Sequence, residues 1–386
     1  MSDKADAPKK SQVVSGLQDI VITQQDICYI DGEKGRVIYR GYDIADLAHN
    51  ATFEEVCYLL WHGDLPNQTQ LDELREQLTA AMMLPSELLL ILRALPTNAE
   101  PMRVLETGVA VLGMIDPEAN DDAHASDMLK ALRLTAQLTC ITTAWHRIRE
   151  GKYPILPVPE KTFAYNFLYM LFGEAPDAYA VDTLNVALIL HADHELNAST
   201  FAARVTAATL SDMHSAVISA IGTLKGPLHG GANQAVMEML EEIGTPENVE
   251  PWLEDFLAQK KKVMGFGHRV YRTKDPRAVV LEEMSEELGK RSGQTKWYEM
   301  SRRLETAFQP KVAAKGIYPN VDFYSASAYH VMGIPHDLFT PIFACSRIAG
   351  WSAHLLEQYA DNRLIRPTSE YTGATDLVWK PIEERS

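Results

Sequence analysis

The chain of 386 residues contains few cysteines, and they are not arranged as metal ligands or as a disulfide framework. The four thiols lie far apart, each among apolar neighbours and none in a C-x-x-C pair: Cys28, Cys57, Cys140 and Cys345. This pattern argues against a zinc centre or a set of disulfides. It indicates free thiols buried in a protein of a reducing compartment.

An excess of positive charge and a long apolar run are also lacking. The net charge is −16, from 36 basic and 52 acidic residues, which argues against nucleic acid as the main partner, because binding phosphates needs a basic face. The longest apolar run, Leu88–Leu92, is much too short to span a bilayer. The first ten residues, MSDKADAPKK, contain no apolar segment of a secretory signal. We therefore expect a soluble, cytoplasmic protein with no membrane partner.

Common cofactor and metal motifs are missing as well. Gly265-Phe-Gly267 is half of a G-x-G-x-x-G motif, but Val270 takes the third position and no strand precedes it, which excludes a dinucleotide fold. His191 and His194 would share a helix face, yet H-A-D-H-E has neither order of the zinc motifs. We favour anion binding for this pair, with a structural role at a helix end as the alternative and no metal.

Apolar residues are spaced with helical periodicity along most of the sequence. Residues 1–16 are predicted to be disordered, and the stretch from Cys28 to Gly41, which contains a D-G turn, predicts a small β-hairpin. Thr52-Phe-Glu-Glu55 is a capping box that opens a helix. The predicted helices are 56–61, 67–82, 86–95, 102–114, 125–149, 162–172, 178–195, 199–222, 232–243, 250–262, 276–290, 295–314, 323–332 and 335–360. These patterns predict a nearly all-α protein without a repeat of 20–50 residues.

The loop from Val263 to Arg277 concentrates basic residues on this acidic chain. It carries His268 and four cations: Arg269, Arg272, Lys274 and Arg277. Since it connects two predicted helices, and connections held by rigid elements often carry function, we expect it to bind an anion.

Further polar groups lie among glycine, proline or apolar residues. His229 in G-P-L-H-G-G-A-N precedes a predicted helix, whose N-terminal N–H groups would keep it neutral. Asp322 in P-N-V-D-F-Y should have a raised pKa through desolvation, which suits a base. Arg347 and Arg366 lie in apolar surroundings. Together these groups suggest proton removal beside a carbonyl, with arginines binding the carboxylates of a small polyanion, although each residue alone also fits a structural role.

Four ordered motifs carry a family likeness: GPLHGGAN, MGFGHRVYRxxDPR, PNVDFYS and NRLIRP. In this order and at these separations the chain resembles citrate synthase, over about nine-tenths of its length from Arg40 onwards. The resemblance implies an all-α homodimer that joins acetyl-CoA to oxaloacetate and hydrolyses citryl-CoA to citrate and CoA. It also implies a large domain of residues 1–229 and 334–386 and a small CoA-binding domain of residues 230–333.

The resemblance further implies the roles of single residues. His229 would stabilise the enol of acetyl-CoA, Asp322 would take the methyl proton, and His268 would polarise the oxaloacetate carbonyl. Oxaloacetate carboxylates would be held by His194, Arg277, Arg347 and, from the neighbouring subunit, Arg366. CoA would lie along Val263, Met264, Gly265, Phe266 and Gly267, with Arg272 near its phosphates. No cofactor would be bound permanently, and acetyl-CoA would be the co-substrate.

Two alternatives remain at this point. In 2-methylcitrate synthase the same fold uses propionyl-CoA, and one methylene changes discrimination by only about 1–3 kcal/mol. Arg269 after His268, and Phe323-Tyr324 after Asp322, favour citrate. A non-catalytic helical scaffold is the other alternative, and the intact catalytic positions argue against it.

Overall fold

The computed structural model describes residues 13–17 and 20–385. Residues 25–364 form one compact unit, and the described residues of 13–24 belong with 365–385 to a second unit. The sequence predicts that residues 1–16 are disordered. Of these, residues 1–12 lie outside the described residues. The part that is described includes a single 3-10 turn, η1 (Ser15–Leu17).

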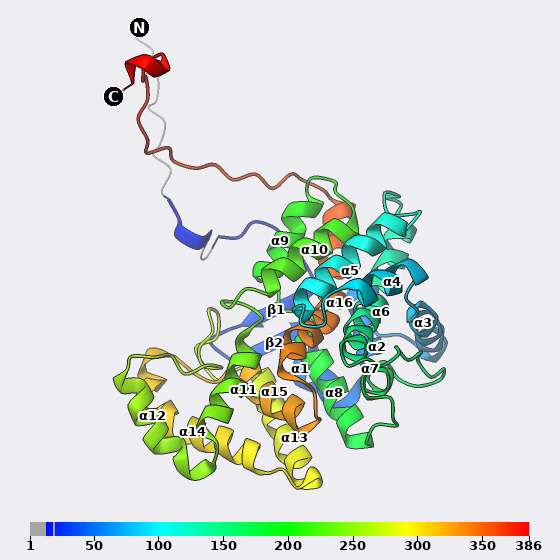
Figure 1. Ribbon diagram of the computed structural model, residues 1–386, viewed down its shortest axis with the longest axis vertical. Helices are drawn as coiled ribbons and strands as arrows, with labels where there is room; N and C mark the ends of the chain where they lie inside the picture. The colour runs from blue at the N-terminus through cyan, green and yellow to red at the C-terminus, as the bar shows by residue number, and fades with distance from the viewer. Residues whose placement is uncertain (1–12, 18–19, 386) are drawn as a thin grey trace. The chain divides into compact units, whose positions relative to one another are not determined.

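Helices make up most of the compact unit (Figure 1), and the predicted all-α class is confirmed. The first eight helices are α1 (Ile44–Asn50), α2 (Phe53–His62), α3 (Gln68–Ala81), α4 (Ser86–Ala94), α5 (Pro101–Ile115), α6 (His124–Arg149), α7 (Phe163–Phe172) and α8 (Ala178–His191). The others are α9 (Ala198–Ala207), α10 (Met213–Leu224), α11 (Ala232–Ile243), α12 (Val249–Ala258), α13 (Pro276–Ser292), α14 (Lys296–Val312), α15 (Val321–Val331) and α16 (Phe339–Ala360). Short 3-10 turns are η2 (Pro246–Asn248), η3 (Ala313–Lys315), η4 (His336–Leu338) and, in the second unit, η5 (Ile382–Glu384).

A small antiparallel sheet precedes the helices. Strands β1 (Cys28–Asp31) and β2 (Arg36–Tyr39) form the predicted hairpin, with Asp31 paired to Arg36. A third strand, β3 (Tyr42–Asp43), which the sequence did not predict, pairs with β2. The hairpin turn, residues 32–35, contacts the loop that carries His268.

Helix boundaries follow local capping chemistry. The predicted capping box is confirmed: Glu55 N–H donates to Thr52 Oγ1 over 3.4 Å, and Thr52 N–H donates to Glu55 Oε2 over 2.7 Å. Asn67 and Gln70 form a second box at the start of α3. Because each box satisfies two N–H groups that have no partner within the helix, it specifies where the helix begins.

The predicted helix 199–222 is wrong, since the structure has two helices there, α9 and α10, which pack against each other. Leu210 between them has a left-handed backbone, with φ of 62°, which no α-helix continues through. Asp212 then caps α10 by accepting from Ser215 N–H over 3.0 Å. The pair Ser211-Asp212 is a helix-start signal that the periodic apolar pattern concealed.

The predicted helix 178–195 also ends too late, because α8 stops at His191. Asp193 accepts from Glu195 N–H over 3.0 Å, and Glu195 has a φ of 52°. Asn197 then caps α9. His191 and His194 therefore do not share a helix face, and residues 192–197 form an irregular connection that presents His194 by itself.

Other boundaries shift for similar reasons. The predicted helix 250–262 ends at Ala258, since Lys260 has a left-handed backbone with φ of 58°. The predicted helix 335–360 begins with η4, and α16 starts only at Phe339. The remaining boundaries differ by three residues or fewer, close to the usual uncertainty of helix ends.

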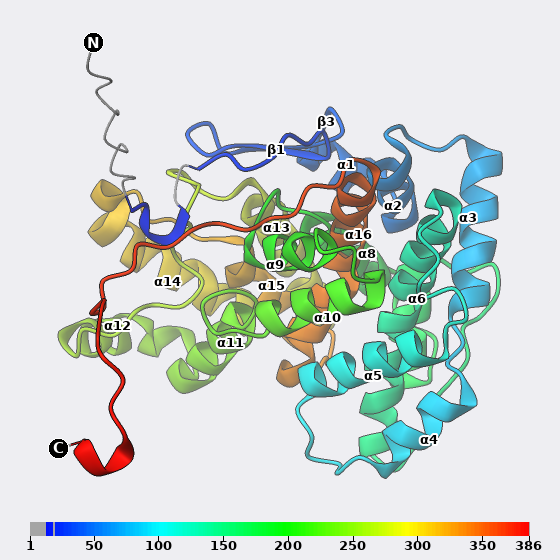
Figure 2. The same cartoon turned by 90° about the horizontal axis from the view of Figure 1, so that it is seen from above.

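Helix α16 lies in the core of the compact unit and packs against α2, α6, α8, α9 and α10. Nearly all of its residues from Phe339 to Leu356 are buried, and a helix buried on all sides belongs inside a large protein. The predicted burial of the four free cysteines is also confirmed. Figures 1 and 2 show α11–α15 gathered at one end of the unit, away from α3–α6. The predicted domain division at residues 230 and 333 stays a prediction.

Within the described residues, no single helix is long and apolar enough to cross a membrane; the bent pair α3–α4 meets that requirement only by length and composition.

Candidate active site

Six of the predicted site residues lie in one region of the compact unit. They come from three irregular connections and from the helices α13, α15 and α16. The charges of Arg277 and Arg347 act on both His194 and Asp322, and His194 also lies within the electrostatic range of the other two imidazoles. The six are His194, His229, His268, Arg277, Asp322 and Arg347.

Hydrogen bonds determine which nitrogen of His268 carries its proton. Nδ1 of this ring accepts from the backbone N–H groups of Val270, over 3.1 Å, and Tyr271, over 3.3 Å. A backbone N–H can only donate, so Nδ1 is unprotonated and the neutral ring carries its hydrogen on Nε2. Burial, with the nearby Arg277 charge, lowers the pKa of His268 to about 4. The ring is therefore a neutral N–H donor at physiological pH.

His229 has the opposite tautomer. Its Nε2 accepts from the N–H of Ser199 over 3.3 Å and lies 2.8 Å from Ser199 Oγ, so the hydrogen of the neutral ring is on Nδ1. Burial, with a smaller contribution from Arg347, lowers the pKa of His229 to about 4. The predicted neutral state is supported, but burial is its main cause, and the helix N-terminus that contacts the ring belongs to α9 and not to the following α11.

His194 connects two parts of the site. Its Nε2 lies 3.0 Å from Tyr271 Oη, and its ring centroid is 5.0 Å from that of His268. Burial and the Arg277 charge place the pKa of His194 well below its ordinary value. A second neutral imidazole therefore lies beside His268.

Asp322 lies in the first turn of α15, because Asn320 caps this helix by accepting from Asp322 N–H over 3.1 Å. The side chain is 8% exposed, and within the described residues its Oδ1 has no hydrogen-bond partner. Burial raises the pKa of Asp322 from 3.8 to about 7, although Arg277 and Arg347 oppose this. A carboxylate with such a pKa is well suited to accept a proton near neutral pH.

Both arginines of the site are buried and held in place. Arg277 donates to Asp275 through Nε over 3.0 Å and through Nη2 over 2.8 Å. Burial opposes the charge of Arg277, but Asp275 more than restores it, so the pKa ends above its ordinary value. Arg347 donates from Nε to the His191 carbonyl over 2.7 Å, and burial lowers its pKa to about 10. Its two Nη groups make no hydrogen bond within the described chain, which leaves them able to bind an anion.

The predicted CoA-binding stretch 263–267 is tied to the segment that precedes Asp322. Gly267 N–H donates to the Tyr318 carbonyl over 2.8 Å, and Asn320 N–H donates to the Gly265 carbonyl over 2.9 Å. A side chain at Gly265 would lie 2.8 Å from Phe323 and Val236, and its φ is 75°. Packing inside the protein therefore requires a glycine at position 265, independently of any bound ligand.

The two remaining predicted binding residues are both exposed, and the charge of one of them, Arg272, acts on His268. Arg272 is exposed, and its backbone N–H donates to the Gly32 carbonyl in the hairpin turn over 2.9 Å. Arg366 is exposed in residues 365–385 of the second unit.

Four residues that orient these groups were not predicted from the sequence. They are Ser199 beside His229, Tyr271 beside His194, Asp275 on Arg277, and Asn320 at the start of α15. Asp275-Pro276 and Asn320 carry ordinary helix-start signals, which could have identified both. No local signal in the sequence marks Ser199 or Tyr271.

The arrangement combines a buried carboxylate, two imidazoles whose N–H positions follow from their hydrogen bonds, and two guanidinium groups oriented by hydrogen bonds. Such a set can remove a proton from carbon, stabilise the oxygen where charge develops, and bind carboxylates. No described residue acts as a covalent nucleophile in this scheme.

Comparisons with known proteins agree with this chemistry. Residues 16–368 match the family description "Citrate synthase, C-terminal domain". The chain is 51% identical to citrate synthase 2 of Bacillus subtilis, over 96% of this chain and 99% of that one. It is 48% identical to the citrate synthase of Haloferax volcanii, over 96% and 98%, and 43% identical to the 2-methylcitrate synthase of Shewanella oneidensis, over 90% and 91%.

Solved structures give the same result. The citrate synthase of Thermotoga maritima superposes with a TM-score of 0.88 at 40% identity, covering 97% of this chain and all of the other. A ternary complex of Thermoplasma acidophilum citrate synthase with carboxymethyl coenzyme A and oxaloacetate superposes with a TM-score of 0.91 at 35% identity, with the same coverage.

Proposed function

Because the chain belongs to the citrate synthase family, we propose that it joins acetyl-CoA to oxaloacetate and hydrolyses the resulting citryl-CoA to citrate and free CoA. In this class of acyltransferases the acyl group becomes an alkyl group on transfer. The methyl carbon of acetyl-CoA loses a proton and forms a bond to the carbonyl carbon of oxaloacetate. Water then cleaves the thioester, and CoA leaves as the thiol.

The three catalytic residues act on adjacent atoms. Asp322 takes the methyl proton, and the Nδ1–H of His229 donates to the thioester oxygen as the enol forms. The Nε2–H of His268 donates to the oxaloacetate carbonyl, which becomes the alkoxide as the new bond forms. Since both imidazoles are neutral and oriented before substrate binds, they need little reorganisation as charge develops.

The substrates are held by residues around this centre. His194, Arg277 and Arg347 bind the carboxylates of oxaloacetate, and Arg366 from the neighbouring subunit of a homodimer completes the set. CoA lies along Val263–Gly267, with Arg272 near its phosphates. Closure of the small domain, residues 230–333, excludes water from the site. A cytoplasmic location, the lack of a permanent cofactor and the lack of nucleic-acid or membrane partners are part of the same proposal.

The observation that carries the proposal is the convergence of three groups: Asp322, with a pKa of about 7, and two neutral histidines of opposite tautomer. Of these, His229 lies near Arg347 and His268 near Arg277. The test is the release of free thiol from acetyl-CoA, which should require oxaloacetate. Asp322→Asn should lower kcat by roughly 10²–10⁴, the usual contribution of a general base. Asp182→Asn, at an exposed position on α8, should keep the parent rate. An Asp322→Asn enzyme near the parent rate would refute the assigned base.

A second candidate is 2-methylcitrate synthesis from propionyl-CoA, because a relative of that name is 43% identical to this chain. The two reactions differ by one methylene in the acyl group. Measurement of kcat/KM for acetyl-CoA and propionyl-CoA side by side separates them, and a preference for propionyl-CoA would replace citrate by 2-methylcitrate as the product.

A further inference from the structure

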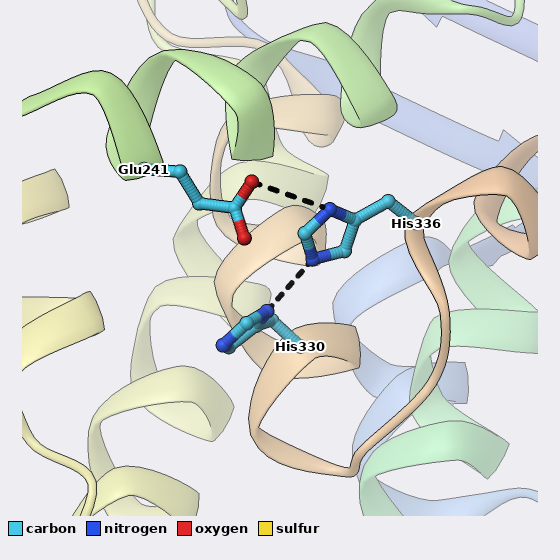
Figure 3. A group of neighbouring side chains, drawn as sticks. All are labelled: Glu241, His330 and His336. Atoms are coloured by element: carbon cyan, nitrogen blue, oxygen red, sulfur yellow. Dashed lines mark hydrogen bonds and ion pairs between the residues drawn. The ribbon is translucent and has the colours of Figure 1, made fainter. Parts of the chain in front are cut away.

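Two histidines and a glutamate from three separate elements form a group that includes none of the proposed catalytic residues (Figure 3). Glu241 lies in the last turn of α11, His330 next to the end of α15, and His336 at the start of η4. His330 Nδ1 and His336 Nε2 are 2.8 Å apart, and His336 Nδ1 is 3.6 Å from Glu241 Oε2. One ligand atom from each of the three lies within 4.8 Å of the others, and in the described part of the chain no other such group occurs.

We propose that Glu241, His330 and His336 bind a Zn²⁺ ion. Two imidazole nitrogens and a carboxylate oxygen are ligands that zinc prefers, whereas calcium and magnesium prefer oxygen alone. Zinc bonds of roughly 2.0–2.2 Å bring ligand atoms to about 3.3 Å from one another. The ligand atoms lie within 4.8 Å of one another, so side-chain rotation has to bring them closer. Because His336 faces His330 with Nε2 and Glu241 with Nδ1, its ring must also turn to give the ion one nitrogen that the other two ligands can reach. The ion replaces the hydrogen bond between the two rings, and each neutral ring supplies one lone pair.

The surroundings suit such an ion. Glu241 is exposed and both histidines are partly exposed, so zinc can enter from solvent and keep a water molecule as its fourth ligand. The His330 ring packs against Trp297 at 4.3 Å, which holds the ring in place. The charges near this ring are Glu241, which favours a cation, and Lys296, which opposes one.

Neighbouring contacts show what the ion would join. Asp337, next to His336, pairs with Arg149 at the end of α6 over 2.9 Å. Between His330 and His336 the chain turns at Gly333, with a φ of 80°. A zinc ion would therefore link the ends of α11 and α15 to a segment held by α6. This link should raise the thermal stability of the protein when zinc is added.

The experiment uses the full chain with Co²⁺ as a spectroscopic substitute, followed by competition with Zn²⁺. The parent should bind one Co²⁺ per chain with the strong visible absorption of a four-coordinate site, and Zn²⁺ should displace it and raise Tm. His336→Gln and Glu241→Gln should each weaken binding by more than the roughly 10–100-fold that loss of an outer partner costs.

His124→Gln, at an exposed position at the start of α6, is the matched control and should bind as the parent does. Equal binding by the parent and His336→Gln would overturn the proposal, as would an absence of binding in the parent. Because the measurement does not involve turnover, either result leaves the proposed reaction unaffected.

Discussion

At the scale of single residues, function and stability oppose each other at the carboxyl of Asp322. Folding raises its pKa from 3.8 to about 7 because the group is buried. Between these pH values the folded protein binds more protons than the unfolded chain, so its free energy of unfolding falls as pH rises through this window. A charged base at pH 8 therefore destabilises the fold that holds it.

Asp322→Asn should remove this pH dependence. The free energy of unfolding of the variant, relative to the parent, should rise between about pH 5 and pH 8 by on the order of 2 kcal/mol. Denaturant unfolding at both pH values measures this, with Asp182→Asn as a control that should show no such change. If the free energies of unfolding of variant and parent differ by the same amount at both pH values, the raised pKa of Asp322 is contradicted.

The same group should govern the pH dependence of catalysis. At low concentrations of both substrates, kcat/KM reports the free enzyme, and Asp322 acts as a base only when ionised. We expect kcat/KM to rise as pH increases from about 5.5, to reach half of its plateau near pH 7, and to level off above about pH 8. His229 and His268, with pKa values of about 4, should add no inflection in that range. A flat profile between pH 5.5 and 8 would assign the base to another group.

At the scale of elements, the hairpin turn supports the loop that carries His268. A side chain at Gly32 would lie 2.3 Å from the Val270 carbonyl oxygen, and one at Gly35 would lie 2.6 Å from Thr273. Arg272 N–H donates to the Gly32 carbonyl. Because Val270 N–H in turn donates to His268 Nδ1, a displaced loop would also misplace the His268 ring.

Gly32→Ala should therefore lower activity from outside the site. Overpacking of this kind costs about 1–3 kcal/mol in stability, and kcat should fall, since the His268 N–H no longer meets the substrate carbonyl. Steady-state kinetics and thermal unfolding measure the two effects. Glu33→Ala, exposed in the same turn, should change neither. An unchanged kcat in Gly32→Ala would show that the turn does not position His268.

At the scale of the whole molecule, the proposed role of Arg366 requires two chains. Arg366→Ala and Asp322→Ala homodimers should each be nearly inactive. After subunit exchange in equal mixture, half of the dimers would carry one intact site, which recovers roughly a quarter of the parent's sites. Thiol release by the mixture measures this recovery.

A mixture of Asp322→Ala with Arg347→Ala is the matched control. Since Arg347 acts on Asp322 of its own chain, that mixture should recover nothing. If demonstrated exchange of the Arg366 mixture also yields no activity, the site is complete within one chain.

The sequence by itself determined the elements whose causes are local. Apolar periodicity predicted the helical class, the D-G turn predicted the hairpin, and Thr52 with Glu55 predicted the start of α2, because each involves neighbours within a few residues. Where periodicity continued past a break, as at Leu210, the prediction failed. The helix is interrupted there, although the apolar residues keep their helical spacing through the break.

Only the tertiary structure decided the properties of the site. The tautomer of His229 depends on Ser199, 30 positions away, and the orientation of Arg347 depends on the His191 carbonyl, 156 positions away. The burial that raises the pKa of Asp322 likewise comes from packing across several helices. The sequence identified which side chains could carry the chemistry. Their protonation follows from distant contacts, because a proton's position depends on which donors and charges surround it in the folded chain.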